Sequence, residues 1–304
     1  REMDDMRLET STEIPELLQM GRYEEAIHSC SKALQESPEN FEVLVNQGLG
    51  HQCMDDFEKA LECYSLAIKM GPQDPFVHMN RGLCYKALQQ YDDALACYGQ
   101  SLKLNPMYKN AHCNKGNTLY HLQRFEDAIE CYNKAIQLDP NFAHAFHNKA
   151  NALKALKRYP EALECDDKAV KCDPSLAPAH SGKGLSLYKL KQYDQALECY
   201  EKALLLDPED VYSHMIKGQL LFFLKRYTEA LECQRRAIHL NPMEKMAYCL
   251  RGDTLRALGR YPEAIESYKL ALELDPNDAC AQTNLQNLAK LVNQEEEEEE
   301  QGGN

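Results

Sequence analysis

The chain has 304 residues and a net charge of −14, of which a run of glutamates at 295–300 supplies six charges. Nucleic acids and anionic membranes attract basic surfaces, so this mildly acidic body argues against either as the main partner. No stretch of about 20 apolar residues could cross a bilayer, and no secretory signal is recognisable. The chain opens at Arg1 rather than at a methionine, which keeps open the interpretation that it is a fragment of a longer protein.

From residue 7 to residue 278 the chain repeats itself every 34 residues, in three unbroken columns. The aromatic column is Tyr23, Phe57, Tyr91, Phe125, Tyr159, Tyr193, Tyr227 and Tyr261; the alanine column is Ala26, Ala60, Ala94, Ala128, Ala162, Ala196, Ala230 and Ala264; the proline column is Pro38, Pro72, Pro106, Pro140, Pro174, Pro208, Pro242 and Pro276. After a leader at 1–6, the columns set eight repeats at 7–40, 41–74, 75–108, 109–142, 143–176, 177–210, 211–244 and 245–278.

Each repeat has the pattern of two helices. In 109–142, apolar residues recur at spacings of three and four on both sides of a break near Gln123, and the proline ends the second helix because it cannot donate the next backbone hydrogen bond. A column of small residues near Gly116 in the first helix lets the two helices approach closely. One pair cannot bury its own apolar face, so neighbouring pairs must stack.

Two segments follow the last repeat. Ala281, Leu285, Leu288 and Val292 form one apolar stripe, which predicts a capping helix at 279–293 with Asp278 as its N-cap. The glutamate run then opposes the helix dipole and repels itself, so we expect residues 294–304 to be a disordered tail.

The chain contains thirteen cysteines, but no two of them have C-x-x-C spacing. Equivalent residues of stacked helices lie roughly 8–10 Å apart, farther than the limit of about 7 Å between the Cα atoms of a disulfide. We therefore expect the cysteines that recur at the repeat interval to be small apolar core residues, and the protein to reside in a reducing, cytoplasmic compartment. Six of the thirteen recur at the repeat interval: Cys63, Cys97, Cys131, Cys165, Cys199 and Cys233.

The glycine, aromatic, alanine and proline columns resemble the tetratricopeptide repeat family. The resemblance implies an all-α fold, an α-solenoid wound as a right-handed superhelix, whose concave face is lined by the first helices and binds protein segments. It departs from the family pattern in a histidine column (His78, His112, His180, His214) and a basic column (Arg81, Lys115, Lys149, Lys183, Lys217, Arg251). We expect the histidines to be packing residues and the basic side chains to pair with nearby glutamates such as Glu130 and Glu198.

Aligning the repeats places amides at the centre of the expected groove and apolar residues at its flanks. Asparagine offers two donors and an acceptor, so a ladder of them can bind the backbone of an extended peptide, which is similar to the tetratricopeptide arm of O-GlcNAc transferase. The same amides also fit the simpler interpretation of bonds within the protein. The predicted groove residues are Asn46, Asn80, Asn114, Asn117, Asn148 and Asn151 at the centre and Phe76, Met79, Leu83, Tyr212, Met215 and Phe222 at the flanks.

Other functions fit the sequence less well. The two-carboxylate clamp that binds chaperone C-termini needs cations where Cys113, Pro178 and Gly182 stand, so no Hsp70 or Hsp90 clamp is expected. His144, His147 and Cys113 form too small a set for a metal site, and no catalytic motif or cofactor loop stands out. We therefore expect a non-enzymatic scaffold or adaptor that binds a protein or extended peptide. The substrate-targeting arm of a larger enzyme is the alternative, and an RNA-binding solenoid is disfavoured by the neutral groove.

Overall fold

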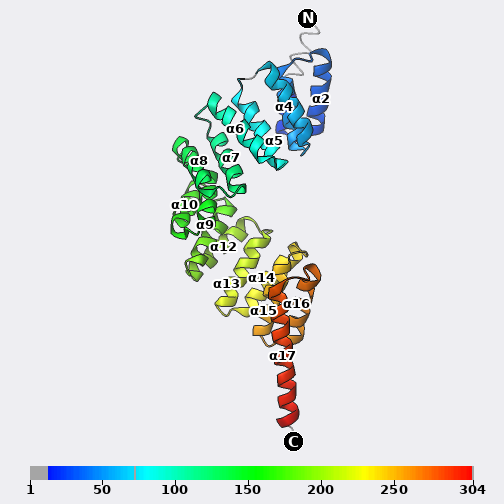
Figure 1. The fold of residues 1–304 in the computed structure, drawn as a ribbon, viewed down its shortest axis with the longest axis vertical. Helices are drawn as coiled ribbons and strands as arrows, with labels where there is room; N and C mark the ends of the chain where they lie inside the picture. The colour runs from blue at the N-terminus through cyan, green and yellow to red at the C-terminus, as the bar shows by residue number, and fades with distance from the viewer. Residues whose placement is uncertain (1–12, 72, 303–304) are drawn as a thin grey trace. The chain divides into compact units, whose positions relative to one another are not determined.

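The computed structural model describes the backbone of residues 13–71 and 73–302 and the side chains up to residue 291, and every regular element in that part is an α-helix. The expected leader and the start of the first repeat lie outside the described residues. The chain divides into two units, unit 1 (residues 1–156) and unit 2 (residues 157–304). Both units are built from helix pairs, which confirms the prediction of an all-α helical repeat solenoid (Figure 1).

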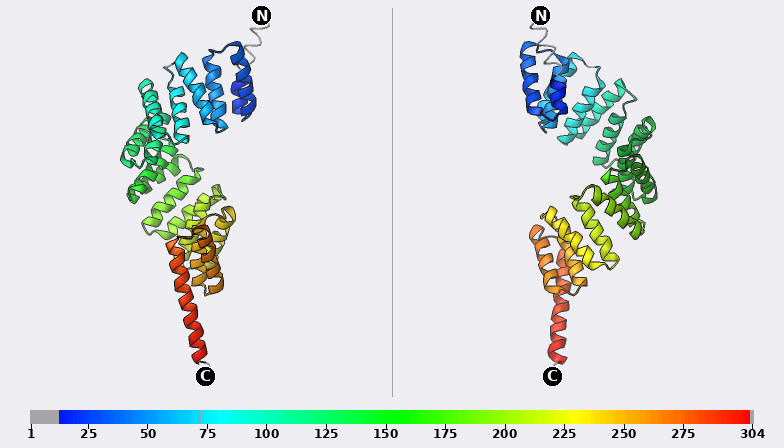
Figure 2. Two further views of the ribbon diagram at one scale, coloured as in Figure 1. Left: turned by 45° about the vertical axis from the view of Figure 1, so that its right-hand side comes forward. Right: turned by 180° about the vertical axis from the view of Figure 1, so that it is seen from behind.

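Unit 1 begins with a helical segment over residues 13–19 and then alternates second and first helices along the chain (Figure 2). Its remaining helices are α2 (Tyr23–Glu36), α3 (Phe41–Cys53), α4 (Phe57–Met70), α5 (Pro75–Ala87), α6 (Tyr91–Leu104), α7 (Lys109–His121), α8 (Phe125–Leu138) and α9 (Ala143–Ala155). The helices of unit 2 are α10 (Tyr159–Cys172), α11 (Ala177–Lys189), α12 (Tyr193–Leu206), α13 (Val211–Phe223), α14 (Tyr227–Leu240), α15 (Lys245–Ala257), α16 (Tyr261–Leu274) and α17 (Ala279–Gly302).

A glycine on the first helix and a tyrosine on the second hold most pairs together. The side chain of Tyr132 is 1% exposed, and a Cβ placed on Gly116 would lie 2.6 Å from its ring. Ordinary carbon contacts are about 3.5–4.0 Å, so only glycine leaves room for the ring. The same pairing recurs with Gly48 and Tyr64, Gly82 and Tyr98, Gly184 and Tyr200, and Gly252 and Tyr268.

The turn inside each repeat uses a left-handed residue. At Gln123, with φ of 59°, the amide bonds to the carbonyl of Tyr120, and the amide of Arg124 bonds to that of Leu119. These two bonds form the Schellman motif that ends a helix and turns the chain. The same position has positive φ in every pair that the structure describes: Gly21, Asp55, Gln89, Gln123, Lys157, Lys191, Lys225 and Gly259.

The loop between repeats is held by the first residues of the next helix. A ring nitrogen of His112 lies 3.0 Å from the carbonyl oxygen of Pro106, and His180 makes the same contact with Pro174. At the equivalent place the hydroxyl of Tyr248 donates to Pro242, and the side-chain amide of Gln282 donates to Pro276. The histidines therefore hold the loop, in addition to the packing expected of them.

The C-terminal helix α17 joins unit 2 as a further first helix. The carboxylate of Asp278 accepts from the amide of Ala281, and Asn284 donates to Asp253 on α15. Leu288 is buried against α15 and α16. The helix then continues through the glutamate run to Gly302, beyond the end expected at residue 293 (Figure 2). Extending an existing helix adds one bond per residue without a new nucleus, and glutamate is a good helix former, so the helix passes the expected boundary.

Candidate functional site

The predicted groove residues divide between the two units. Tyr212, Met215 and Phe222 belong to unit 2, and the others belong to unit 1. Phe76 and Tyr212 are well exposed, at 38% and 43%. Those that are half-buried, with some surface left for a ligand, are Asn46, Leu83, Asn114, Asn117, Asn148, Asn151 and Phe222.

Three predicted contact residues lie in the core instead. Met79, Asn80 and Met215 are only 6%, 4% and 6% exposed. Met79 packs with Tyr98 and Ala111, while Asn80 donates to the backbone carbonyl of Phe76 one turn earlier. Side chains on this part of the first helix face the neighbouring helices rather than solvent, so these three cannot offer a ligand much surface.

The central amides form a hydrogen-bonded group between repeats. The side-chain oxygen of Asn117 on α7 accepts from the hydroxyl of Tyr132 on α8 at 2.9 Å and from the amide of Asn148 on α9 at 2.9 Å. The amide of Asn151 lies 3.0 Å from a ring nitrogen of His147. Bonding within the protein, the simpler interpretation of the amides, thus accounts for part of this group, and Asn117 and Asn148 connect successive repeats of unit 1.

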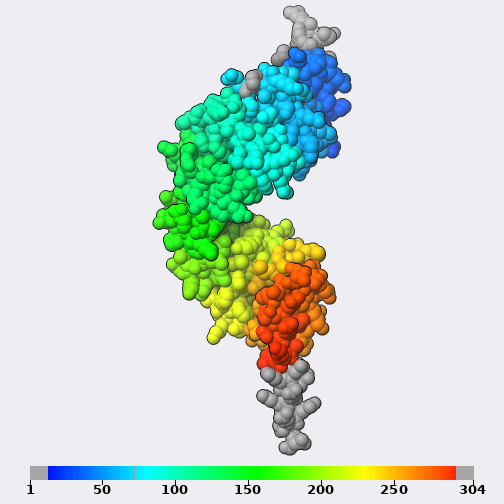
Figure 3. Space-filling view, in the orientation of Figure 1, coloured from blue at the N-terminus to red at the C-terminus, as the bar shows by residue number. Residues whose placement is uncertain are grey.

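These amides line a polar pocket of about 200 Å³ in unit 1. Asn117, Asn148 and Asn151 form part of its wall, in the stretch coloured cyan to green in Figure 3. The rest of the wall is Lys86, Tyr120, His121 and Tyr132. Lys86 stands in the last turn of α5, and burial lowers the pKa of its ammonium group. The pocket therefore combines one partly desolvated cation with amide and hydroxyl groups.

Lys86, Tyr120 and His121 were not among the predicted site residues. They stand at the C-terminal ends of the first helices, where the prediction named only Phe222 of unit 2. The sequence does hold a signal for them, because the repeat position of Lys86 has a long side chain in seven successive repeats. These residues are Gln52, Lys86, Tyr120, Lys154, Tyr188, Phe222 and Arg256. The ring of His121 also stacks on Tyr91 of the preceding repeat, with ring centroids 5.9 Å apart and planes 7° apart.

Unit 2 carries an aromatic cluster at the corresponding helix ends. Phe223 is 49% exposed and stacks on Tyr193, with centroids 6.1 Å apart and planes 17° apart. The ring centroids of Tyr188 and Phe222 lie 6.3 and 6.0 Å from that of Phe223. The ring centroid of Tyr227 lies 5.5 Å from that of Phe222. Phe222 is thus one member of a larger aromatic cluster, in which Phe223 is exposed and the other rings are half-buried.

The basic column pairs mainly with partners other than the expected glutamates. Lys183 pairs with Asp167 at 2.7 Å and Lys217 with Glu201 at 3.3 Å, each on the second helix of the preceding repeat. Arg81 donates to the sulfur of Cys97, and Arg251 donates to the hydroxyl of Ser267. In all four pairs the long basic side chain reaches across to an adjacent second helix, and its partner lies sixteen residues away in the sequence. None of these partners is one of the expected glutamates, such as Glu130 or Glu198, so that expectation was wrong for these four pairs.

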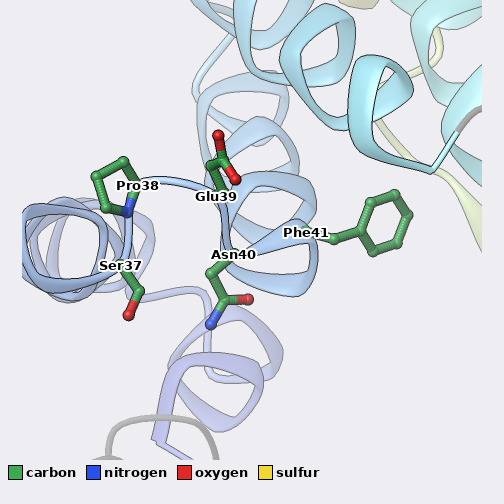
Figure 4. A pocket seen from close by; sticks show the side chains of 5 residues that line it. All are labelled: Ser37, Pro38, Glu39, Asn40 and Phe41. Atoms are coloured by element: carbon green, nitrogen blue, oxygen red, sulfur yellow. The ribbon is translucent and has the colours of Figure 1, made fainter.

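A larger hollow of about 740 Å³ lies at the loop between α2 and α3, but it offers no chemistry. Its walls are the five consecutive residues from Ser37 to Phe41. In Figure 4 the side chain of Phe41 points away from those of Ser37 and Pro38. The side-chain oxygen of Asn40 already caps α3 through the amide of Val43. This hollow is the open side of a turn, with no convergent polar groups.

All thirteen cysteines lie in the described part of the chain and keep their thiols outside disulfides, and most of those in the repeated column are buried. Burial raises the pKa of Cys63 to about 11 and that of Cys84 to about 12. A thiol with such a pKa stays protonated and unreactive near neutral pH. These cysteines act as small apolar core residues, as their spacing predicted.

In the part of the chain that the structure describes, no helix has the length and apolar character needed to cross a membrane. Tetratricopeptide repeat family models match most of the chain, in three versions of the same repeat. The first matches residues 75–108, 110–142, 177–210 and 246–278; the second matches 131–164; the third matches 16–40 and 211–242.

Solved structures similar to this chain share its fold at low sequence identity. A chain of the APC/C hetero-tetramer Cut9–Hcn1 has a TM-score of 0.69 at 15% identity, covering 88% of this chain and 52% of its own length. PilF of Pseudomonas aeruginosa has a TM-score of 0.63 at 20% identity, and the match covers 69% of this chain and 95% of PilF. YrrB, titled a tetratricopeptide protein with an unusual peptide-binding site, has a TM-score of 0.52 at 23% identity, and the match covers 61% of this chain and 96% of YrrB. The chain therefore spans about half the length of the first of these. A search of the curated proteins found no match.

Proposed function

Because the chain belongs to the tetratricopeptide repeat family, we propose that it is a non-catalytic interaction scaffold that holds an extended peptide of a partner protein along the first helices of unit 1. The observation that carries the proposal is the amide group of Asn117, Asn148 and Asn151, which lines the polar pocket. The buried cysteine thiols, which form no disulfides in the described residues, favour a reducing compartment such as the cytoplasm for this role.

The amides suit the backbone of a peptide rather than one particular side chain. Asn148 uses its amide nitrogen within the protein, and this leaves its side-chain oxygen able to accept from a peptide N–H. Within the described residues, the side-chain amide of Asn114 donates only to the sulfur of Met79, at 3.4 Å, which is a weak bond that a peptide carbonyl can replace. A ligand bound in this way is extended, because its backbone groups must be free of helical hydrogen bonds.

The test is to select peptides that bind the full chain from a displayed library of short random sequences. The affinities of the selected peptides for the chain and its variants are then measured by fluorescence anisotropy. We expect Asn114→Ala and Asn151→Ala each to weaken binding by roughly two- to tenfold, because a neutral hydrogen bond contributes about 0.5–1.5 kcal/mol. Asn133→Ala is the matched control, since Asn133 is exposed on the second helix α8 of the same unit. A library that yields no binder, or equal losses in all three variants, would refute the proposal.

A further inference from the structure

We propose that the polar pocket around Lys86 is a carboxylate site, which receives an acidic side chain or the C-terminal carboxylate of the bound peptide. The inference rests on the proposed function and adds the chemistry that the partner must bring. It differs from the two-carboxylate clamp, because its cation comes from the last turn of α5 and not from the position of Cys113.

The wall of the pocket carries a positive charge and no negative one. Lys86 is the only lysine or arginine among the lining residues, and none of them is acidic, although the chain as a whole carries a net charge of −14. Within the described part of the chain, the charged groups that act on the pKa of Lys86 include no carboxylate, and burial lowers that pKa. A partly buried ammonium group with no carboxylate beside it is stabilised by an anion that reaches it.

The pocket wall also offers hydrogen-bond donors that the described part of the protein leaves unused. The side-chain oxygen of Asn117 is occupied by Tyr132 and Asn148, while its amide nitrogen makes no hydrogen bond within the described residues. That amide, the hydroxyl of Tyr120 and the ammonium of Lys86 line one cavity. A carboxylate only accepts hydrogen bonds, so it matches a wall whose unused groups are donors.

The volume of the pocket and its single positive charge limit which anion it can hold. A cavity of about 200 Å³ admits a small group and not a whole ligand of drug size. One lysine balances one negative charge, and a phosphate group carrying close to two charges leaves an excess that the surrounding acidic chain cannot neutralise. The pocket is thus suited to a single carboxylate at one point along a peptide.

A first experiment uses sodium acetate as the probe and does not depend on any peptide. In ¹⁵N spectra of the full chain, we expect acetate to shift the side-chain amide signals of Asn117 and Asn151 in the wild type and in Lys86→Arg but not in Lys86→Met. Sodium chloride at equal ionic strength is the control for screening. Shifts that persist in Lys86→Met, or that chloride reproduces, overturn the inference.

A second experiment uses the selected peptides with each acidic residue changed to its amide and, separately, with an amidated C-terminus. Neutralising one carboxylate is expected to weaken binding about tenfold in the wild type and to have no effect in Lys86→Met, because a charge-assisted bond contributes more than a neutral one. Whichever peptide loses affinity identifies the source of the carboxylate. Lys103→Met, on the second helix α6, is the matched control.

The two experiments separate the inference from the proposed function. Peptides that bind equally well with and without their carboxylates leave the scaffold standing and overturn the carboxylate site. A phosphoserine in place of the acidic residue that binds more tightly also overturns it, because the pocket would then prefer the dianion. Loss of affinity in Lys86→Met counts only if its thermal unfolding matches that of the wild type.

Discussion

Replacing Gly116 by alanine tests the packing rule that holds each helix pair together. The added Cβ would lie 2.6 Å from Cε1 of Tyr132, about 1 Å inside an ordinary carbon contact. The tyrosine cannot swing away freely, because its side chain is 1% exposed and its hydroxyl is bonded to Asn117. The substitution must therefore displace either the ring or the helix.

Three contributions set the size of the effect. Overpacking a tight core costs about 1–3 kcal/mol, and losing the bond between Tyr132 and Asn117 costs about 1 kcal/mol more. Alanine in place of glycine returns about 1 kcal/mol of helix stability. We expect Gly116→Ala to lower the free energy of unfolding by about 2 kcal/mol.

Gly99 supplies the matched control on the second helix α6. A Cβ placed there would meet nothing within 4 Å, so Gly99→Ala keeps only the helix gain and should raise stability by about 1 kcal/mol. Urea unfolding followed by circular dichroism measures both variants, and amide exchange in α7 and α8 locates the weakened pair. Similar shifts of the same sign in the two variants would refute the reasoning.

Three further predictions follow from turns, buried charge and thiols. Lys191→Gly should raise the free energy of unfolding by about 0.5–1 kcal/mol, because Lys191 has φ of 62° where glycine has no steric cost; no gain in urea unfolding would contradict this. Burial raises the pKa of Asp253, so the folded state binds that proton more readily than the unfolded chain does, and its contribution to stability improves as pH falls through the raised pKa. Asp253→Asn keeps an acceptor for Tyr268 and should raise the melting temperature at pH 7 and flatten this pH dependence, whereas a lower melting temperature would show that the charge stabilises the fold. With an aromatic disulfide reagent at neutral pH, Cys53 and Cys280 should react first because both are exposed, and rapid modification of the buried thiols would argue against the packed core.

The repeat architecture could be predicted from the sequence because the information is local and repeated. The aromatic column and the prolines mark where each second helix begins and ends, and the helix bounds follow the 34-residue period. The cysteine column also revealed its packing role, since a fixed spacing in stacked helices excludes disulfides.

The candidate site was harder to predict, because it depends on where individual side chains point. Asn80 and Asn114 occupy equivalent positions, yet the first is 4% exposed and the second is half-buried. Lys86 comes from a different repeat from Asn117 and Asn148, and the three residues line one pocket only when the first helices α5, α7 and α9 stack. Such a meeting of residues from three repeats has no signature in the spacing of any one repeat.

The bonds to the proline carbonyls have a consequence for how this chain tolerates change. The acceptor in each loop is a main-chain oxygen, whose position depends on the path of the backbone and not on any side chain. Histidine, tyrosine and glutamine all reach it, at His112, Tyr248 and Gln282. Exchange among these three residue types therefore keeps the bond to the loop, and the histidines at this position that make the bond are accounted for by that structural role.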